Sequence, residues 1–245
     1  MENINTLIII IVVLALIIVV LLVCGFATKQ SPQDNENFLS GSGDNKYSGI
    51  GYSNENKPYD KPYVWKNFIS PSMCEAIITA SKNNLMESEV VGGKNKAVRN
   101  SQQYWIPKTD PLVKPLFDKV SQTFGIPIEN AEDLQVVRYL PGQFYGEHHD
   151  ACCDQNDKCM EFVGKGGQRK LTVLIYLNDN FTEGHTHFRN LNLKLKVPPG
   201  DAIVFRPLAT NSSLCHPHAL HAGMPVSSGV KWVANLWFRE NKFTY

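Results

Sequence analysis

The stretch Tyr145–Asp150, with the sequence YGEHHD, decides how the rest of this chain is interpreted. In an extended segment, residues two positions apart point to the same side, so the His148 imidazole and the Asp150 carboxylate would face one point in space. Far downstream, His221 would complete a set of two histidines and one carboxylate on one face of a metal ion. This donor set suits a non-haem Fe(II) centre with open positions for a cosubstrate and O₂. We therefore interpret the rest of the chain as a scaffold for this site and a tether to a membrane.

Around this stretch, from residue 134 onward, the sequence has the pattern of short β-strands. Strands are expected over residues 134–140, 170–177, 186–188, 194–197, 202–205 and 231–238. Gly and Pro turns separate them, and no helical pattern intervenes. This pattern predicts a mainly β fold, as a sandwich or a double-sheet jelly roll.

Upstream of these strands, the sequence predicts two helices that buttress the sheet, which makes the fold α+β. Order is expected to begin with a strand at 63–65. The sequence at 70–75 starts with a Ser cap and has Pro in its first turn, which is typical of a helix start. That helix should end near Asn84. Asp110-Pro111 begins the second helix, which should end at Gly125.

The N-terminal part of the chain predicts a membrane anchor. Residues 7–27 are an almost unbroken run of Leu, Ile and Val without charge, long enough to cross a hydrocarbon core of about 30 Å. A cleaved signal peptide is the alternative, but it usually has a shorter apolar region after basic residues. We expect a transmembrane signal-anchor over 1–28, a flexible polar linker over 29–60, and a catalytic domain over 61–245.

The six cysteines bear on the compartment of this domain. Four of them lie near the predicted site, at Cys152, Cys153, Cys159 and Cys215. None has the paired spacing of a structural zinc site. A loop pinned by one or two disulfides is expected, which implies an oxidising compartment. Reduced thiols are the alternative.

Two further features concern membrane orientation. Lys29 alone would keep the C-terminal side in the cytoplasm. The tripeptides 180–182 and 211–213 are N-glycosylation acceptor patterns, which matter only in the secretory path. Together with the cysteines, they favour a glycoprotein whose catalytic domain is lumenal, in the endoplasmic reticulum or the secretory path. The formal net charge of +1 argues against nucleic acid as a partner.

The order of these motifs resembles the prolyl 4-hydroxylase family. Residues 135–150 resemble its iron-site segment, and residues 221–237 resemble its second segment. Between them, 169–178 matches its central strand and 183–188 its Gly-Thr-Phe turn. The resemblance covers about residues 60–245, and the ordered combination is far more specific than the His-x-Asp pattern alone.

This resemblance implies a double-stranded β-helix, or jelly roll, with Fe(II) as cofactor, 2-oxoglutarate and O₂ as cosubstrates, and ascorbate as reductant. The implied reaction is of the procollagen-proline 4-dioxygenase type. It forms 4-hydroxyproline in a proline-rich or collagen-like polypeptide, and 2-oxoglutarate is decarboxylated to succinate and CO₂. In such enzymes the protein supplies ligation, orientation and exclusion of water.

The resemblance also assigns roles to residues. His148, Asp150 and His221 would be the iron ligands, and Lys231 would bind the distal carboxylate of 2-oxoglutarate. A fixed cation at the end of a dry pocket suits that carboxylate, because charges attract more strongly there than in water. The candidates for further contacts to the cosubstrate are Tyr139, Tyr176 and Thr186. The candidates for contacts to the peptide substrate are Arg99, Tyr145 and Trp237.

The histidines by themselves leave the ligand choice open. Other histidines crowd the same two segments, at positions 149, 216 and 218. Only His148 fits the Tyr-x-x-His-x-Asp pattern of the family, and only His221 leads into the segment that contains Lys231. His149 would then lie beside the iron site or be exposed.

Two other functions remain open at this point. The same core can serve a 2-oxoglutarate oxygenase that acts on a lysyl residue or a small molecule. It can also serve as a non-catalytic binding module in a membrane protein. Retention of all three ligands and Lys231 argues against the second alternative. The sequence leaves the oligomeric state open. It shows no separate peptide-binding domain, so the substrate is expected to be shorter or less repetitive than collagen.

Overall fold

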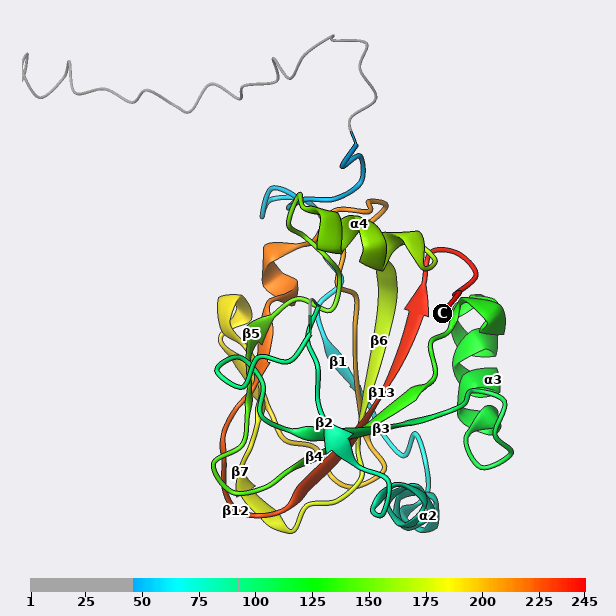
Figure 1. Cartoon of the computed structure of the whole chain (residues 1–245), viewed down its shortest axis with the longest axis vertical. Coiled ribbons are helices and arrows are strands. Elements are labelled where there is room, and N and C mark those ends of the chain that lie inside the picture. The colour runs from blue at the N-terminus through cyan, green and yellow to red at the C-terminus, as the bar shows by residue number, and fades with distance from the viewer. Residues whose placement is uncertain (1–45, 92) are drawn as a thin grey trace, which may run out of the picture. The chain divides into compact units, whose positions relative to one another are not determined.

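The computed structural model describes residues 46–91 and 93–245 (Figure 1). The anchor expected over 1–28 and the first part of the expected linker lie outside these residues. Within the described residues, no helix has the length and apolar character needed to span a membrane.

The larger of the two main sheets has seven antiparallel strands, and β13 lies at its centre. In spatial order they are β1 (Tyr63–Trp65), β10 (Ala202–Phe205), β6 (Arg169–Tyr176), β13 (Lys231–Arg239), β4 (Leu134–Tyr139), β3 (Gln102–Ile106) and β2 (Met86–Glu87). The central strands are long apolar runs because both faces of the sheet are covered. The strands expected around 134–140, 170–177, 202–205 and 231–238 are thus present.

The second sheet carries the histidines of the predicted site. Its strands are β5 (Tyr145–His148), β11 (His221–Gly223), β8 (Thr186–Phe188) and β9 (Leu193–Leu195), in that order. A two-stranded ribbon of β7 (Phe181–Glu183) and β12 (Val226–Gly229) extends from it. Apolar side chains of both sheets form a common core, among them Val137, Leu174, Phe188, Phe205 and Val233. This arrangement agrees with the predicted double-sheet jelly roll.

Two helices cover the outer face of the large sheet, on the side away from β5, β7 and β12 (Figure 1). Helix α2 (Pro71–Ser81) is capped by Ser70, whose hydroxyl accepts from the Met73 amide at 3.2 Å. Helix α3 (Lys114–Phe124) begins later than predicted, because a turn precedes it in which the Val113 amide donates to the Asp110 carbonyl at 3.0 Å. It ends as predicted at Gly125, whose φ is +64°.

The side chains of β13 alternate between the two faces of the large sheet, as the period of a strand requires. Trp232, Ala234, Leu236 and Phe238 pack toward the helices, whereas Val233 packs between the two sheets. The odd-numbered positions therefore place Lys231 and Trp237 on the same face as the site.

Helix α4 (Asp157–Gly164) differs from the sequence prediction, which placed no helix among the strands. Asn156 caps it by accepting from the Cys159 amide at 2.9 Å. A disulfide joins Cys152 to Cys159 and closes this short segment on itself. A helix of only two turns has too few apolar positions to stand out by periodicity.

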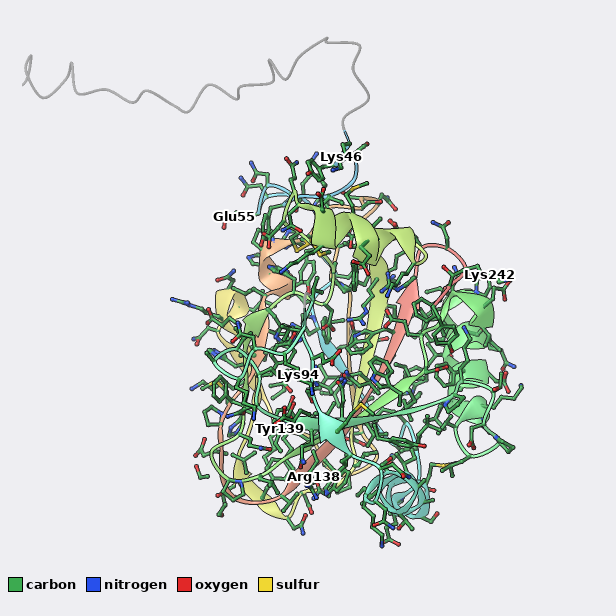
Figure 2. The ribbon with its side chains drawn as sticks, viewed as in Figure 1. Lys46, Glu55, Lys94, Arg138, Tyr139 and Lys242 are labelled. Atoms are coloured by element: carbon green, nitrogen blue, oxygen red, sulfur yellow. A yellow bond between two sulfur atoms is a disulfide. The ribbon has the colours of Figure 1, made fainter. Side chains whose placement is uncertain are left out.

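The predicted linker boundary at residue 60 is also too late, since residues 46–60 pack on the folded domain. Ile50 is buried beside Cys152 and Cys159. Lys46 and Glu55 mark this segment in Figure 2, and Lys46 forms an ion pair with Asp157 of α4. Composition predicted disorder here because one buried Ile in a polar segment hardly changes the average.

Candidate active site

The structure brings His148, Asp150 and His221 together at the second sheet. His148 ends β5 and is the register partner of His221, which begins β11. Asp150 lies two residues beyond the end of β5. Its Oδ1 is 3.6 Å from Nε2 of His148 and 4.0 Å from Nε2 of His221. One ligand atom from each residue lies within 4.8 Å of the others.

Backbone carbonyls orient both imidazoles of this triad. Nδ1 of His148 lies 2.8 Å from the Gly146 carbonyl oxygen, and Nδ1 of His221 lies 3.0 Å from that of Ala219. When Nδ1–H donates to the carbonyl, Nε2 carries the lone pair that binds a metal. Burial, followed by the charge of His148, lowers the pKa of His221 to about 4. His221 is therefore neutral at pH 7, as a metal ligand must be.

The Asp150 carboxylate is held by its other oxygen. Oδ2 accepts from the Thr172 hydroxyl at 2.7 Å and from the Trp237 indole N–H at 3.0 Å. Burial alone would raise the pKa of this carboxyl. The hydrogen bond from His148 and the charges of His221, His148 and Arg169 outweigh burial, so the pKa lies well below its usual range. Oδ1 is thus left as a charged oxygen that faces the two imidazoles.

This donor set fits a divalent iron ion. Two imidazole nitrogens and one carboxylate oxygen converge from two segments, and the second oxygen of the carboxylate is already hydrogen-bonded. Such a set occupies one face of the ion and leaves the other positions for exogenous ligands. His148, Asp150 and His221 are the residues that would hold it.

Lys231 is a buried cation that points into the space between the two sheets. Only 2 % of its surface is exposed, and its Nζ donates to the Gly184 carbonyl at 2.7 Å. In residues 46–91 and 93–245, no carboxylate forms an ion pair with it. Burial, with a smaller contribution from Lys196, lowers the pKa of Lys231 to about 7. An unpaired buried ammonium is costly, so this position favours an anionic ligand.

The other predicted cosubstrate contacts lie around Lys231. Its Nζ is 5.3 Å from the ring centre of Tyr139 and 4.9 Å from that of Tyr176. The Tyr176 hydroxyl already interacts with the Thr186 hydroxyl at 2.9 Å and with the Leu195 carbonyl at 3.1 Å. One cavity joins Lys231, Tyr139 and Thr186 to the metal triad. Tyr176 thus lies beside Lys231 and is hydrogen-bonded to Thr186, which lines this cavity.

A larger cavity of about 490 Å³ adjoins the inner one and shares Arg99, Tyr145, Asp150 and Trp237 with it. Aromatic side chains on its wall are Trp105, Tyr145, Phe162, Trp237, Phe243 and Tyr245, and cationic ones are Arg99, Lys165, Arg169 and Arg239. The buried Arg99 guanidinium lies 4.6 Å from the ring centre of Tyr145 and donates to the Ser101 hydroxyl. The three residues predicted to contact the substrate therefore share one cavity.

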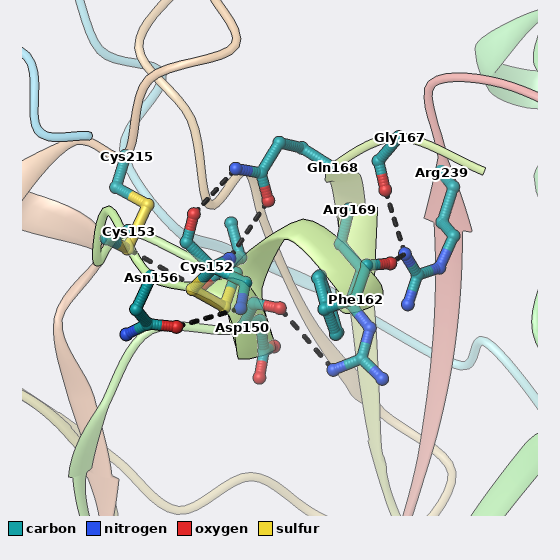
Figure 3. The surroundings of a disulfide bond; sticks show 12 residues. Asp150, Cys152, Cys153, Asn156, Phe162, Gly167, Gln168, Arg169, Cys215 and Arg239 are labelled. Atoms are coloured by element: carbon teal, nitrogen blue, oxygen red, sulfur yellow. Dashed lines mark hydrogen bonds between the residues drawn. A yellow bond between two sulfur atoms is a disulfide. The ribbon is translucent and has the colours of Figure 1, made fainter. Parts of the chain in front are cut away.

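Sequence reasoning missed a buried charge cluster on the wall of this cavity. Glu132 pairs with Arg169 at 2.6 Å and with Arg239 at 2.7 Å. The Arg169 guanidinium lies 3.5 Å from the ring centre of Trp237, and it donates to the Asp150 carbonyl at 3.4 Å. Figure 3 shows the Arg169 bond to the Asp150 carbonyl, and Arg239 on the neighbouring strand with its bond to the Gly167 carbonyl. The available signal was a charged residue at the end of each apolar strand, since Arg169 begins β6 and Arg239 ends β13.

Comparison with known proteins also indicates an Fe(II)- and 2-oxoglutarate-dependent oxygenase. A model of the 2OG-Fe(II) oxygenase superfamily matches residues 134–239. A relative named "Putative prolyl 4-hydroxylase", from Acanthamoeba polyphaga mimivirus, is 57% identical over 195 residues, which are 80% of this chain and 81% of the relative. Prolyl 4-hydroxylase 2 of Arabidopsis thaliana is 32% identical in an alignment of 210 positions that covers 75% of this chain and 68% of the relative.

A solved structure is similar as well. The viral collagen prolyl hydroxylase of Paramecium bursaria Chlorella virus-1, in complex with 2-oxoglutarate, superposes with a TM-score of 0.58 at 32% identity. The match covers 73% of this chain and 95% of the viral one.

Proposed function

Because the chain belongs to the prolyl 4-hydroxylase family of Fe(II)- and 2-oxoglutarate-dependent dioxygenases, we propose that it forms 4-hydroxyproline in a proline-rich or collagen-like polypeptide. The observation that carries this proposal is one continuous cavity that runs from the triad of His148, Asp150 and His221 to the unpaired cation Lys231. The oxidation of proline is coupled to decarboxylation of 2-oxoglutarate to succinate and CO₂, with ascorbate as the proposed reductant.

Bound Fe(II) supplies the activation of O₂, and the residues of this chain bind and orient the reactants. His148, Asp150 and His221 would hold the ion. The Lys231 ammonium would pair with the distal carboxylate of 2-oxoglutarate, and Thr186 and Tyr139 would line its binding site. Because Lys231 is buried, the charge pair there would be stronger than in water.

The aromatic cavity supports a proline-rich peptide as the substrate. Proline-rich segments form an extended polyproline helix that docks in aromatic-lined grooves. Tyr145 and Trp237 offer ring faces next to the triad, and Arg99 offers a guanidinium to a peptide carbonyl. These three residues would set the target proline against the iron site.

The compartment is part of the proposal. A single-pass membrane protein with a lumenal catalytic domain would combine the apolar run at 7–27 with the two disulfides of the described part. Asn180 and Asn211, the two potential glycosylation sites, are both exposed.

Mass spectrometry of peptides tests the activity. The full chain, solubilised in detergent, is incubated with Fe(II), 2-oxoglutarate and ascorbate, together with Pro-Pro-Gly repeats or Pro/Ser-rich peptides. A gain of one oxygen on proline that is absent in His148→Ala establishes the proposal and ranks the substrates. Succinate without peptide oxidation would indicate a lysyl or small-molecule substrate. Bound iron without any turnover would indicate a binding module.

A further inference from the structure

A second disulfide joins the two segments that carry the iron ligands. Cys153 lies three residues after Asp150, and Cys215 lies six residues before His221. The bond between them spans 62 residues of sequence, and both cysteines are buried (Figure 3). Ala151 and Leu208 pack around it in a small apolar cluster. The bridge therefore connects the segment that follows β5 to the segment that leads into β11.

Asp150 is the ligand that the β-ladder does not hold. The ladder pairs His148 with His221, but β5 ends at His148, and the register is irregular between His221 and Gly223. Two contacts to Oδ2 orient the carboxylate, from Thr172 and Trp237. Hydrogen bonds from Arg169 to the Asp150 carbonyl, and between the Gln168 side chain and the Cys152 backbone, hold the chain here from one side. The covalent tie of this segment comes next, at Cys153.

Through Cys153, the segment that follows Asp150 is bonded to Cys215, whose backbone is hydrogen-bonded on one side. Cys215 donates its amide to the Gly51 carbonyl and accepts from the Ser53 amide, each at 2.9 Å. It also forms a bridge pair with Leu208 on its other side. Cys215 thus lies between two neighbouring segments of the chain that hold its backbone in place. The disulfide links Cys153 to this position.

We propose that the Cys153–Cys215 bridge is a positioning element of the iron site. It ties the segment that carries Asp150 to the segment that leads into His221, and it thereby sets the distance between the carboxylate and the imidazole. The Cys152–Cys159 bridge has no such role, because it joins residues seven apart within one segment. Because Cys152 and Cys153 are neighbours in sequence but belong to different bridges, removal of one bridge is a matched control for removal of the other.

Metal affinity tests this role directly. Fe(II) or Co(II) is titrated anaerobically into the apo-protein as full chain in detergent, and the visible absorption of Co(II) reports the ligand geometry. We expect C153A/C215A to lose about tenfold or more in affinity, the range found when residues that orient metal ligands are changed, and C152A/C159A to stay within about twofold. Substitution is preferred to reduction, because free thiols at Cys153 and Cys215 would form a second set of metal donors with His149.

Thermal unfolding of the same variants separates positioning from stabilisation. If C153A/C215A is folded, has a lower Tm and binds Co(II) with wild-type affinity and spectrum, the bridge only stabilises the fold and the proposal is wrong. An equal loss of affinity in C152A/C159A would overturn it too. If C153A/C215A does not fold, C153V/C215A refills the apolar cluster and gives the same comparison with C152A/C159A. None of these measurements involves a peptide, so they are independent of the proposed substrate.

Discussion

Lys231 and Arg239 are buried cations at opposite ends of β13, and their surroundings differ. Arg239 shares Glu132 with Arg169, and its Nη1 also donates to the carbonyls of Phe162 and Gly167. Lys231 has a single hydrogen bond, to Gly184, and no ion pair within the described part of the chain. A compensated buried charge belongs to the architecture, whereas an uncompensated one marks a place for a ligand. The same strand therefore supplies a structural cluster at one end and a binding site at the other.

The largest effect should come from removing the unpaired cation. Lys231→Met should weaken binding of 2-oxoglutarate by about 10²-fold or more, because the dianion loses its buried partner. The free energy of unfolding should not fall, since the mutation removes an unpaired buried charge. Anaerobic titration calorimetry and urea unfolding measure the two quantities. A clear loss of stability would mean that Lys231 is structural and would remove the contrast with Arg239.

Removing the Glu132 carboxylate, which Arg169 and Arg239 share, should instead lower the stability of the fold. Glu132→Gln removes the carboxylate that Arg169 and Arg239 share, so the free energy of unfolding should fall by about 3–5 kcal/mol. Glu147→Gln breaks an exposed pair with Arg189 and should change it by about 1 kcal/mol or less. Urea unfolding of both variants provides the comparison. Equal effects of the two substitutions would show that the cluster is not a structural unit.

A smaller effect, on metal affinity, is expected from removing the hydrogen bond between Thr172 and the Asp150 carboxylate. Thr172→Val removes one donor to Asp150 Oδ2 at nearly constant volume, and it should weaken binding of Fe(II) or Co(II) by about tenfold. Thr182→Val, on the exposed ribbon, is the control. Unchanged metal affinity in Thr172→Val would indicate that Trp237 alone orients the carboxylate.

The smallest signal is expected from the protonation of Lys231 when 2-oxoglutarate binds. The pKa of Lys231 in the fold is about 7, below its ordinary value of 10.5, so in this window the unfolded chain holds a proton that the ligand-free fold has lost. The stability of the ligand-free protein should therefore rise with pH between about 7 and 10.5, relative to Lys231→Met. Binding of 2-oxoglutarate at pH 8 should take up a proton.

Calorimetry in buffers of different ionisation enthalpy measures that proton uptake. Lys231→Arg stays charged and should take up none at this position. Equal uptake in wild type and Lys231→Arg would place the titrating group elsewhere.

The parts of the site that were predictable from sequence share one property, which is local spacing. The positions of His148 and Asp150 follow from the two-residue period of an extended segment, and the strands of the core follow from apolar runs between turns. Helix α4 was missed because a two-turn helix has too little periodicity. Residues 46–60 were missed because Ile50 is a single apolar anchor in a polar segment. The cluster of Glu132, Arg169 and Arg239 was missed because its members lie on three separate elements.

The sequence by itself determined the alternation along each strand and the spacing of His148 and Asp150, since both depend on residues a few positions apart. Only the tertiary structure decided which charges are compensated and which cysteines pair. Arg239 has an anion because Glu132, just before β4, lies beside the end of β13. Lys231 has none because the turn between β7 and β8 presents the Gly184 carbonyl. Burial, which makes an unpaired charge costly, depends on all the chains around a residue, so the roles of the two cations could not be read from their own neighbours in sequence.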